Sequence, residues 1–335
     1  MRRYYLLLLM LLSVCSVSNA QGESGVSEES SIRAMHFVLR IVALDKALLM
    51  VDKASKARIN TIQVTLTDGV RLDHSPWKVR DDAWSKRELL AWVLYAKSKG
   101  IEVIPEIKLL THQEKLFQNN FPDLMFNHST YDPRNNRVYE KVFFLLDEII
   151  ELIQPKSIHI GHDEVAGHNS RSRKKWLLRG EPMLPAELFV SDVLNIHGYL
   201  KKRGVETWMW GDMLVSPNEF PSMLAKHLHG EAIGYGKAVR DKLPKDIVII
   251  DWHYFDSQQD FPTLDVLQKE GFRVIGSTWK KERTIQSFSR YAAKHGAYGM
   301  MATTWWYVQK EEWNVVDRII KFSGQTFLKD FPDAN

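Results

Sequence analysis

The sequence predicts an α/β fold, a closed (β/α)8 TIM barrel built as a single domain, and three observations support this prediction. Eight short apolar or β-branched segments alternate with amphipathic helical segments along the chain. Gly100, Gly204 and Gly271 directly follow expected helices, where a left-handed cap favours glycine. No glycine-rich phosphate loop follows the first strand, which disfavours a nucleotide-binding open sheet with the same local pattern. Together these observations favour the barrel.

The expected strands are short apolar runs bounded by turn residues, as buried parallel strands are. In chain order they cover residues 34–39, 61–66, 101–105, 157–161, 205–210, 246–252, 272–277 and 299–304. The clearest helical patterns lie between them and cover residues 85–99, 136–154, 186–203 and 283–295. In the second of these helices, apolar side chains recur at helical spacing from Val138 to Ile153, which predicts one buried face.

The N-terminal segment has the pattern of a secretory signal peptide. Arg2 and Arg3 precede a short apolar run, and small residues follow up to Ala20. We expect a signal peptide over residues 1–20, a flexible polar leader over 21–31 and the barrel over 32–335. The protein is then exported to a periplasm or to the extracellular space. Attachment of a lipid to Cys15 is the alternative, although Val14 is bulkier than such sites usually accept. No later segment approaches transmembrane length, so no membrane contact is expected after cleavage.

Composition excludes several classes of site and partner. Cys15 is the only cysteine and lies in the segment to be removed, so the mature chain has no disulfide, cysteine nucleophile or thiolate metal site. The net charge is +4 and no basic block stands out, so nucleic acid is not an expected partner. A homodimer is compatible with the sequence, which does not decide the oligomeric state.

Acidic, histidine and tryptophan residues gather at the expected carboxyl ends of the strands. In a barrel these ends surround the active site. Aromatic faces stack on the C–H faces of a sugar while carboxylates bind its hydroxyls, so the set favours a carbohydrate site. The alternative is that the tryptophans belong to the barrel core. The residues concerned are His36, Asp68, Glu106, His112, Asp163, Glu164, Trp210, Asp212, Trp252, Tyr254, Trp279, Trp305 and Trp306.

The segment Ser-Ile-His-Ile-Gly-His-Asp-Glu-Val, residues 157–165, leads from an apolar strand into two adjacent acids. It resembles the His-x-Gly-x-Asp-Glu signature of glycoside hydrolase family 20, the β-N-acetylhexosaminidases. Three further segments resemble the second, third and fifth strands of that family, and they occur in the same order. These are residues 59–68, 101–112 and 208–213. The resemblance covers nearly the whole chain after residue 31.

The resemblance implies an exo-acting enzyme that releases terminal N-acetylglucosamine or N-acetylgalactosamine from glycans with β-linked N-acetylhexosamine, without a cofactor or metal. Enzymes that use two carboxylates as acid and base or nucleophile place them on either side of the sugar, and adjacent residues of one strand are poorly placed to do so. In the substrate-assisted mechanism the acetamido oxygen is the nucleophile and one acid is enough. By resemblance, Glu164 is that acid, and Asp163 orients the acetamido nitrogen and stabilises the oxazolinium ion.

The resemblance also implies roles for the surrounding side chains. Tyr254 is the candidate donor to the acetamido carbonyl, although better-known members carry that tyrosine after a later strand; Tyr298 and Tyr307 are the next candidates. Arg33 is the candidate first-strand arginine for sugar hydroxyls, and His112 and His159 are expected to hold the acids by hydrogen bonds. Tryptophans would box the acetamido methyl group and the sugar face. The expected substrate-binding residues are Arg33, His112, His159, Trp210, Asp212, Trp252, Trp279, Trp305 and Trp306.

The chain departs from the family pattern at several points. Lys108 stands where the family usually has an aspartate, and His162 replaces a small residue within the signature. Gln309 stands near the place where many members have a glutamate that binds distal hydroxyls. The small N-terminal domain of many members is missing, so the chain resembles the compact, single-domain branch. These departures concern the identity of the sugar rather than the candidate acid.

Two other classes of protein remain open at this point. One is a metal-dependent barrel hydrolase that uses His159, His162, Asp163 and His168 as ligands. The other is a glycan-binding barrel without catalytic activity. The presence of both acids disfavours the second class, because binding alone does not need a proton donor.

Overall fold

A computed structural model describes residues 31–40, 42–76, 78–113, 117–165, 180–230 and 235–333. Residues Ser31–Asp333 form one compact unit. The expected signal peptide, with Cys15, and all of the expected leader except Ser31 lie outside the described residues. In the part of the chain that is described, no helix combines the length and the apolar character needed to cross a bilayer.

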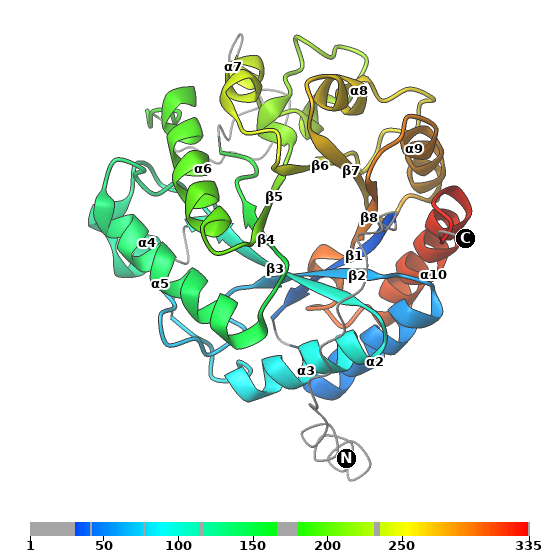
Figure 1. Cartoon of the computed structure of the whole chain (residues 1–335), viewed down its shortest axis with the longest axis horizontal. Helices are drawn as coiled ribbons and strands as arrows, with labels where there is room; N and C mark the ends of the chain where they lie inside the picture. The colour runs from blue at the N-terminus through cyan, green and yellow to red at the C-terminus, as the bar shows by residue number, and fades with distance from the viewer. Residues whose placement is uncertain are drawn as a thin grey trace, which may run out of the picture. The chain divides into compact units, whose positions relative to one another are not determined.

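Eight parallel strands close into a barrel in the order β1 to β8, and β8 pairs with β1. The predicted (β/α)8 TIM barrel is therefore confirmed, and Figure 1 shows the ring of strands with helices outside it. The strands are β1 (Ile32–Leu39), β2 (Thr61–Leu66), β3 (Glu102–Leu109), β4 (Ser157–Gly161), β5 (Glu206–Trp210), β6 (Val248–Trp252), β7 (Arg273–Thr278) and β8 (Gly299–Thr303).

Each strand is followed by at least one helix that packs outside the barrel, and α10 contacts both α9 and α2, which closes the helical layer (Figure 1). The helices are α2 (Leu44–Lys56), α3 (Lys86–Ser98), α4 (Phe117–Asn120), α5 (Asn136–Ile153), α6 (Ala186–Lys201), α7 (Tyr235–Lys242), α8 (Pro262–Lys269), α9 (Glu282–Lys294) and α10 (Trp313–Asp330). The four helices predicted most clearly are α3, α5, α6 and α9. Ser85 begins α3 with a capping box to Glu88, which satisfies two backbone donors.

Strand β3 is longer than predicted. The apolar run that predicts this strand ends at Pro105. In the structure β3 continues through Pro105 to Leu109, with its register against β4 shifting between Glu106 and Leu109. Extended backbone is compatible with the fixed φ of proline, and the pairing of the neighbouring residues is sufficient to continue the strand. As a result, Glu106 lies within the barrel wall.

The carboxylate of Glu106 is fully buried in the barrel interior. It accepts hydrogen bonds from Trp210 Nε1 at 2.9 Å, from His36 Nε2 at 3.1 Å and from the Thr65 hydroxyl. Burial favours the neutral acid, but the hydrogen bond from His36 and the charge of His159 outweigh it, so the pKa of Glu106 lies well below its ordinary value. This polar cluster lies beneath the aromatic side chains of the candidate site.

Candidate active site

In the turn after β4, the side chains of successive residues point in different directions. Gly161 has φ +77°, and a Cβ there would lie 3.2 Å from the backbone of Lys108, so glycine is required. His162 and Glu164 also have positive φ values, 68° and 56°. Such left-handed residues are strained unless the surroundings hold them, and they cluster at functional sites. Here they allow His162 and Asp163 to make contacts in separate parts of the barrel.

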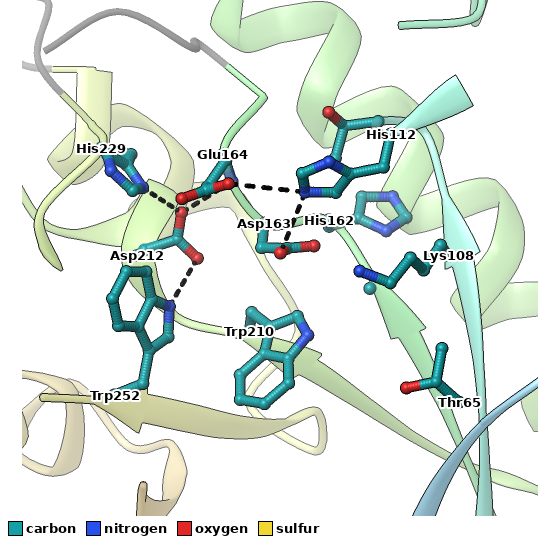
Figure 2. A network of polar contacts seen from close by, with 12 residues as sticks. Thr65, Lys108, His112, His162, Asp163, Glu164, Trp210, Asp212, His229 and Trp252 are labelled. Atoms are coloured by element: carbon teal, nitrogen blue, oxygen red, sulfur yellow. Dashed lines mark hydrogen bonds and ion pairs between the residues drawn. The ribbon is translucent and has the colours of Figure 1, made fainter. Parts of the chain in front are cut away.

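Asp163 forms an ion pair with His112, as the sequence predicts. The two atoms His112 Nε2 and Asp163 Oδ2 lie 3.1 Å apart, and the same nitrogen lies 3.6 Å from Glu164 Oε2 (Figure 2). Burial opposes the charge on both groups. The charge and hydrogen bond of His112, with the charge of Lys108, nevertheless hold the pKa of Asp163 below its ordinary range. Asp163 in turn raises the pKa of His112. Asp163 is therefore an anion at neutral pH.

Asp212 fixes the backbone of Glu164. Its Oδ2 accepts the Glu164 N–H at 2.8 Å and His229 Nδ1 at 2.8 Å, and its Oδ1 accepts Trp252 Nε1 at 3.1 Å (Figure 2). Asp212 is only 1% exposed and both of its oxygens have protein partners. The prediction that Asp212 binds substrate is therefore corrected: its carboxylate positions Glu164 and Trp252 instead. No sequence pattern indicated His229, which comes from the segment between β5 and β6.

His162, the unusual residue of the signature, contacts a second buried carboxylate. Its Nε2 lies 2.8 Å from Asp192 Oδ2 on α6, and Tyr131 and Tyr139 donate their hydroxyls to the same carboxylate. His159, by contrast, lies inside the barrel with its Nδ1 3.8 Å from Glu106. The ligand set of the metal alternative is thus not brought together, and His168 lies outside the described residues.

Tyr254 lies in an aromatic cluster at the ends of β6 to β8. Its ring stacks on Trp252 with centroids 4.7 Å apart, and the Trp279 and Trp305 centroids lie 5.9 and 6.2 Å away. Burial raises the pKa of Tyr254 against the opposing effect of the neighbouring Thr303 and Trp305 side chains, and the charges of Asp163 and Glu164 raise it further. Among the described residues, three buried polar atoms here have no hydrogen-bond partner. They are Asp163 Oδ1, Tyr254 Oη and Trp279 Nε1.

The other predicted tryptophans form the floor and the rim of this cluster. Trp210 is 1% exposed, bonds Glu106 and contacts His159, with ring centroids 4.8 Å apart. Trp305 lies 5.7 Å from Trp210 and is half-buried, and Trp306 is 41% exposed and packs on Trp279. His159 itself is fully buried, and burial lowers the pKa of His159 to about 4. Its predicted bond to the adjacent acids is therefore corrected, since its carboxylate neighbour is Glu106.

A buried cluster of two histidines and an aspartate supports Tyr254 from behind. His227 Nε2 accepts the Tyr254 backbone N–H at 3.4 Å, so its ring proton is on Nδ1 and is donated to Asp256 Oδ2 at 2.5 Å. His253 Nδ1 donates to the same oxygen at 3.1 Å. Burial lowers the pKa of His227 to about 4; Asp251 and Asp256 outweigh burial at His253 and raise its pKa to about 9. No sequence pattern indicated this cluster.

Arg33 does not reach the site, so this prediction is wrong. It is the second residue of β1 and therefore lies at the amino end of the barrel. Its guanidinium bonds the carbonyls of Arg58 and Phe331 at 2.8 and 2.9 Å and pairs with Asp333. Arg40, the residue directly after β1, lies at the carboxyl end instead. It pairs with Asp68 at 3.0 Å, and its buried Nε has no hydrogen-bond partner among the described residues.

Two groups of side chains are compact enough to bind a metal ion. They are His112 with Asp163 and Glu164, and His227 with His253 and Asp256. In the second group the ligand atoms bond one another and the Tyr254 backbone, so a metal would displace these bonds. In the first group His112 Nε2 already bonds Asp163, so a metal would displace this bond as well. The donor sets fit hydrogen bonding better than metal binding.

Comparison with models of protein families shows to which family the chain belongs. Residues 52–320 match the model of the glycosyl hydrolase family 20 catalytic domain. The chain therefore belongs to glycosyl hydrolase family 20. It is 22% identical over 271 residues to a β-hexosaminidase 1 of Coccidioides posadasii, covering 71% of this chain and 41% of that protein. It is 24% identical to a probable β-hexosaminidase of Arthroderma benhamiae, covering 68% and 38%. The chain spans about two fifths of the length of these relatives.

Solved structures support the barrel fold. The chitobiase of Flavobacterium johnsoniae superposes with a TM-score of 0.62 at 16% identity, over 90% of this chain and 50% of that one. Dispersin B superposes with a TM-score of 0.58 at 17% identity, over 88% of this chain and 98% of that one.

Proposed function

We propose that the protein is an exo-acting β-N-acetylhexosaminidase that releases terminal N-acetylglucosamine or N-acetylgalactosamine by substrate-assisted hydrolysis. The observation that carries this proposal is the pair of unpartnered buried atoms beside Glu164, namely Asp163 Oδ1 and Tyr254 Oη. An acetamido group has one N–H donor and one carbonyl acceptor. An ionised Asp163 can accept the N–H, and a protonated Tyr254 can donate to the carbonyl, so the two atoms complement this group.

The proposed reaction follows from these roles. With its nitrogen held by Asp163, the acetamido carbonyl oxygen attacks the anomeric carbon while the bond to the leaving oxygen breaks. Glu164 gives its proton to that oxygen, so the aglycone departs as an alcohol. The cyclic oxazolinium ion carries a positive charge, which Asp163 stabilises. Glu164, now a carboxylate, accepts a proton from the water that attacks the anomeric carbon, and the configuration is retained.

Hydrolysis of matched aryl glycosides tests this function. Nitrophenyl β-N-acetylglucosaminide and β-N-acetylgalactosaminide should be hydrolysed, whereas the β-glucoside with the same leaving group should not, because it has no internal nucleophile. A thiazoline analogue of the cyclic intermediate should inhibit strongly, since it resembles what the site stabilises. Comparable turnover of the glucoside would exclude substrate assistance, and activity that a chelator abolishes would favour the metal-dependent alternative. No turnover of any of these would favour a binding protein.

We also propose export from the cytoplasm, which rests on the pattern of residues 1–20. Sequencing the N-terminus of the protein purified from its natural source would test the expected cleavage after Ala20.

A further inference from the structure

Three lysines lie around the aromatic cluster at the carboxyl ends of β5, β6 and β7. Lys226 Nζ lies 3.5 Å and Lys281 Nζ 5.0 Å from the centroid of the Phe255 ring. Lys280 Nζ lies 4.6 Å from the Trp279 centroid and donates to the Tyr307 hydroxyl. We call Lys226, Lys280 and Lys281 the lysine rim. Ammonium groups held over ring faces are partly oriented and partly desolvated, which prepares them for an anion.

The positive charge of the lysine rim is not neutralised by neighbours. Among the described residues, no carboxylate oxygen lies within 4.0 Å of any of its three ammonium nitrogens, whereas Lys53, Lys86 and Lys201 elsewhere on the surface form ion pairs. Asp256 follows Phe255 in sequence but turns inward to His227 and His253. Burial and the charge of Lys281 lower the pKa of Lys226 although Asp256 opposes them. The three ammonium groups are therefore not engaged in ion pairs within the described part of the chain.

The lysine rim adjoins the proposed catalytic residues without belonging to them. Phe255 directly follows Tyr254, and its ring lies 5.8 Å from that of Trp279, which in turn lies 5.9 Å from Tyr254. Lys226 and Lys281 are exposed, so they lie at the solvent side of the cluster. A sugar whose terminal residue occupies the site at Asp163 and Tyr254 extends its leaving group toward solvent. The lysine rim lies on this solvent side, connected to Tyr254 through the rings of Phe255 and Trp279.

We infer that the lysine rim is a binding site for an anionic leaving group, a sugar that carries a carboxylate or a sulfate ester. This inference rests on the proposed function and adds the chemical class of the glycan. The preferred substrate is then an N-acetylhexosamine β-linked to an acidic sugar. The ammonium groups can pair with the charged substituent of such a sugar, a contact that a neutral chain of N-acetylhexosamine would not make.

Three matched disaccharides test the inference. Each has the same terminal β-N-acetylhexosamine, linked to glucose, to glucuronic acid or to glucose 6-sulfate. The intact protein should hydrolyse at least one acidic disaccharide with a kcat/KM about tenfold above that of the neutral one at low salt, because each exposed ion pair contributes roughly two- to fivefold. Added salt should reduce the ratio. The acidic substrate with the higher ratio identifies whether a carboxylate or a sulfate is recognised.

The double variant Lys226→Gln/Lys281→Gln should bring the ratio of acidic to neutral kcat/KM close to one. The ratio is used because a folding defect lowers both values equally. Lys321→Gln, an exposed lysine on α10, is the matched control and should leave the ratio as in the natural protein. A ratio of one or less in the natural protein, or an unchanged ratio in the double variant, would overturn the inference. Hydrolysis of the aryl N-acetylhexosaminides in that case would leave the proposed function standing, whereas inactivity toward all substrates would overturn both.

Discussion

Two histidine–aspartate clusters lie at the carboxyl end of the barrel, and they differ in how completely their atoms are bonded. The first consists of His112, Asp163 and Glu164, and we call it the site cluster. In it, Asp163 receives one hydrogen bond from His112 and has one oxygen without a partner among the described residues. The second consists of His227, His253 and Asp256, and we call it the support cluster. In it, His227 and His253 donate to one oxygen of Asp256, and the Leu224 N–H donates to the other at 2.9 Å. The same chemical groups thus occur once unsatisfied and once satisfied.

Exposure follows the same division. The Asp163 and His112 side chains are 10% and 14% exposed, whereas those of Asp256 and His227 are 0% and 1%. A buried polar atom without a partner costs free energy, so it persists where a ligand supplies the missing bond. A fully bonded cluster already has its partners and fixes the surrounding chain. The comparison therefore supports the proposed catalytic role of the site cluster, and it indicates that the support cluster positions Tyr254.

Substitution of the two acids, Asp163 and Glu164, should have the largest effect on kcat/KM. Glu164→Gln removes the proton donor and should lower kcat/KM by about 10²- to 10⁴-fold on a disaccharide, whose leaving group needs protonation, and less on a nitrophenyl glycoside. Asp163→Asn impairs formation of the oxazolinium ion and should lower kcat/KM similarly on both substrates. Kinetics of both variants on both substrates measure this. The opposite dependence on leaving group would reverse the two roles, and no effect would place the site elsewhere.

A change in the support cluster should act on stability. Asp256→Asn leaves a charged His253 and the His227 N–H with a weaker acceptor, and should lower the free energy of unfolding by about 3 kcal/mol, as the loss of one partner of a buried ion pair does. Denaturant unfolding measures this. Asp265→Asn is the matched control, because Asp265 pairs with His295 at 2.7 Å on the surface and should contribute little. Equal losses in both variants would contradict the comparison.

Tyr254→Phe tests the residue that joins the two clusters. Removal of a hydroxyl aimed at the acetamido carbonyl should lower kcat by about 10²-fold, as loss of other preorganised donors does. The melting temperature should stay the same or rise, since the lost hydroxyl is buried and has no partner in the described protein. Normal kinetics would show that another tyrosine has this role, and Tyr298→Phe and Tyr307→Phe would then be the variants to measure.

The sequence predicted the barrel and the central acids because both depend on local patterns. Apolar runs give the strands, and the barrel rule places Asp163 and Glu164 at a carboxyl end. The same rule excludes Arg33, which precedes the strand predicted over 34–39, and favours Arg40. Only the resemblance pointed to Arg33, and the structure supports the barrel rule.

Neither the support cluster nor the contact between His229 and Asp212 could be predicted in this way. His227 and His229 both come from the irregular chain between β5 and β6. His227 lies 29 residues before its partner Asp256, and His229 lies 17 residues after its partner Asp212. No period or motif links residues so far apart in sequence, and only folding brings them together. The bonding of each carboxylate is also a tertiary property. For this reason, the sequence could not distinguish Asp212, which is fully bonded, from Asp163, which is not.

The smallest expected effect is a pH dependence of stability that separates the two clusters. Burial opposes the charge of His253, but Asp251 and Asp256 outweigh it and raise its pKa to about 9. The pKa of a histidine in the unfolded chain is about 6.5, which is lower. The stability that the charge of His253 contributes is therefore fully present below a pH of about 6.5. It is lost as the pH rises toward 9.

Asp256→Asn should weaken this dependence by up to about 1 kcal/mol per pH unit, with the rest maintained by Asp251. Asp163→Asn should leave the contribution of His253 in place, because His253 bonds Asp251 and Asp256 rather than Asp163. It should remove only the part of the slope that comes from His112, whose pKa Asp163 raises. Unfolding free energies of the natural protein and both variants, measured between pH 6.5 and pH 9, give the two slopes. A flatter slope in Asp163→Asn than in Asp256→Asn would mean that the charge on the site cluster, not on the support cluster, stabilises this end of the barrel.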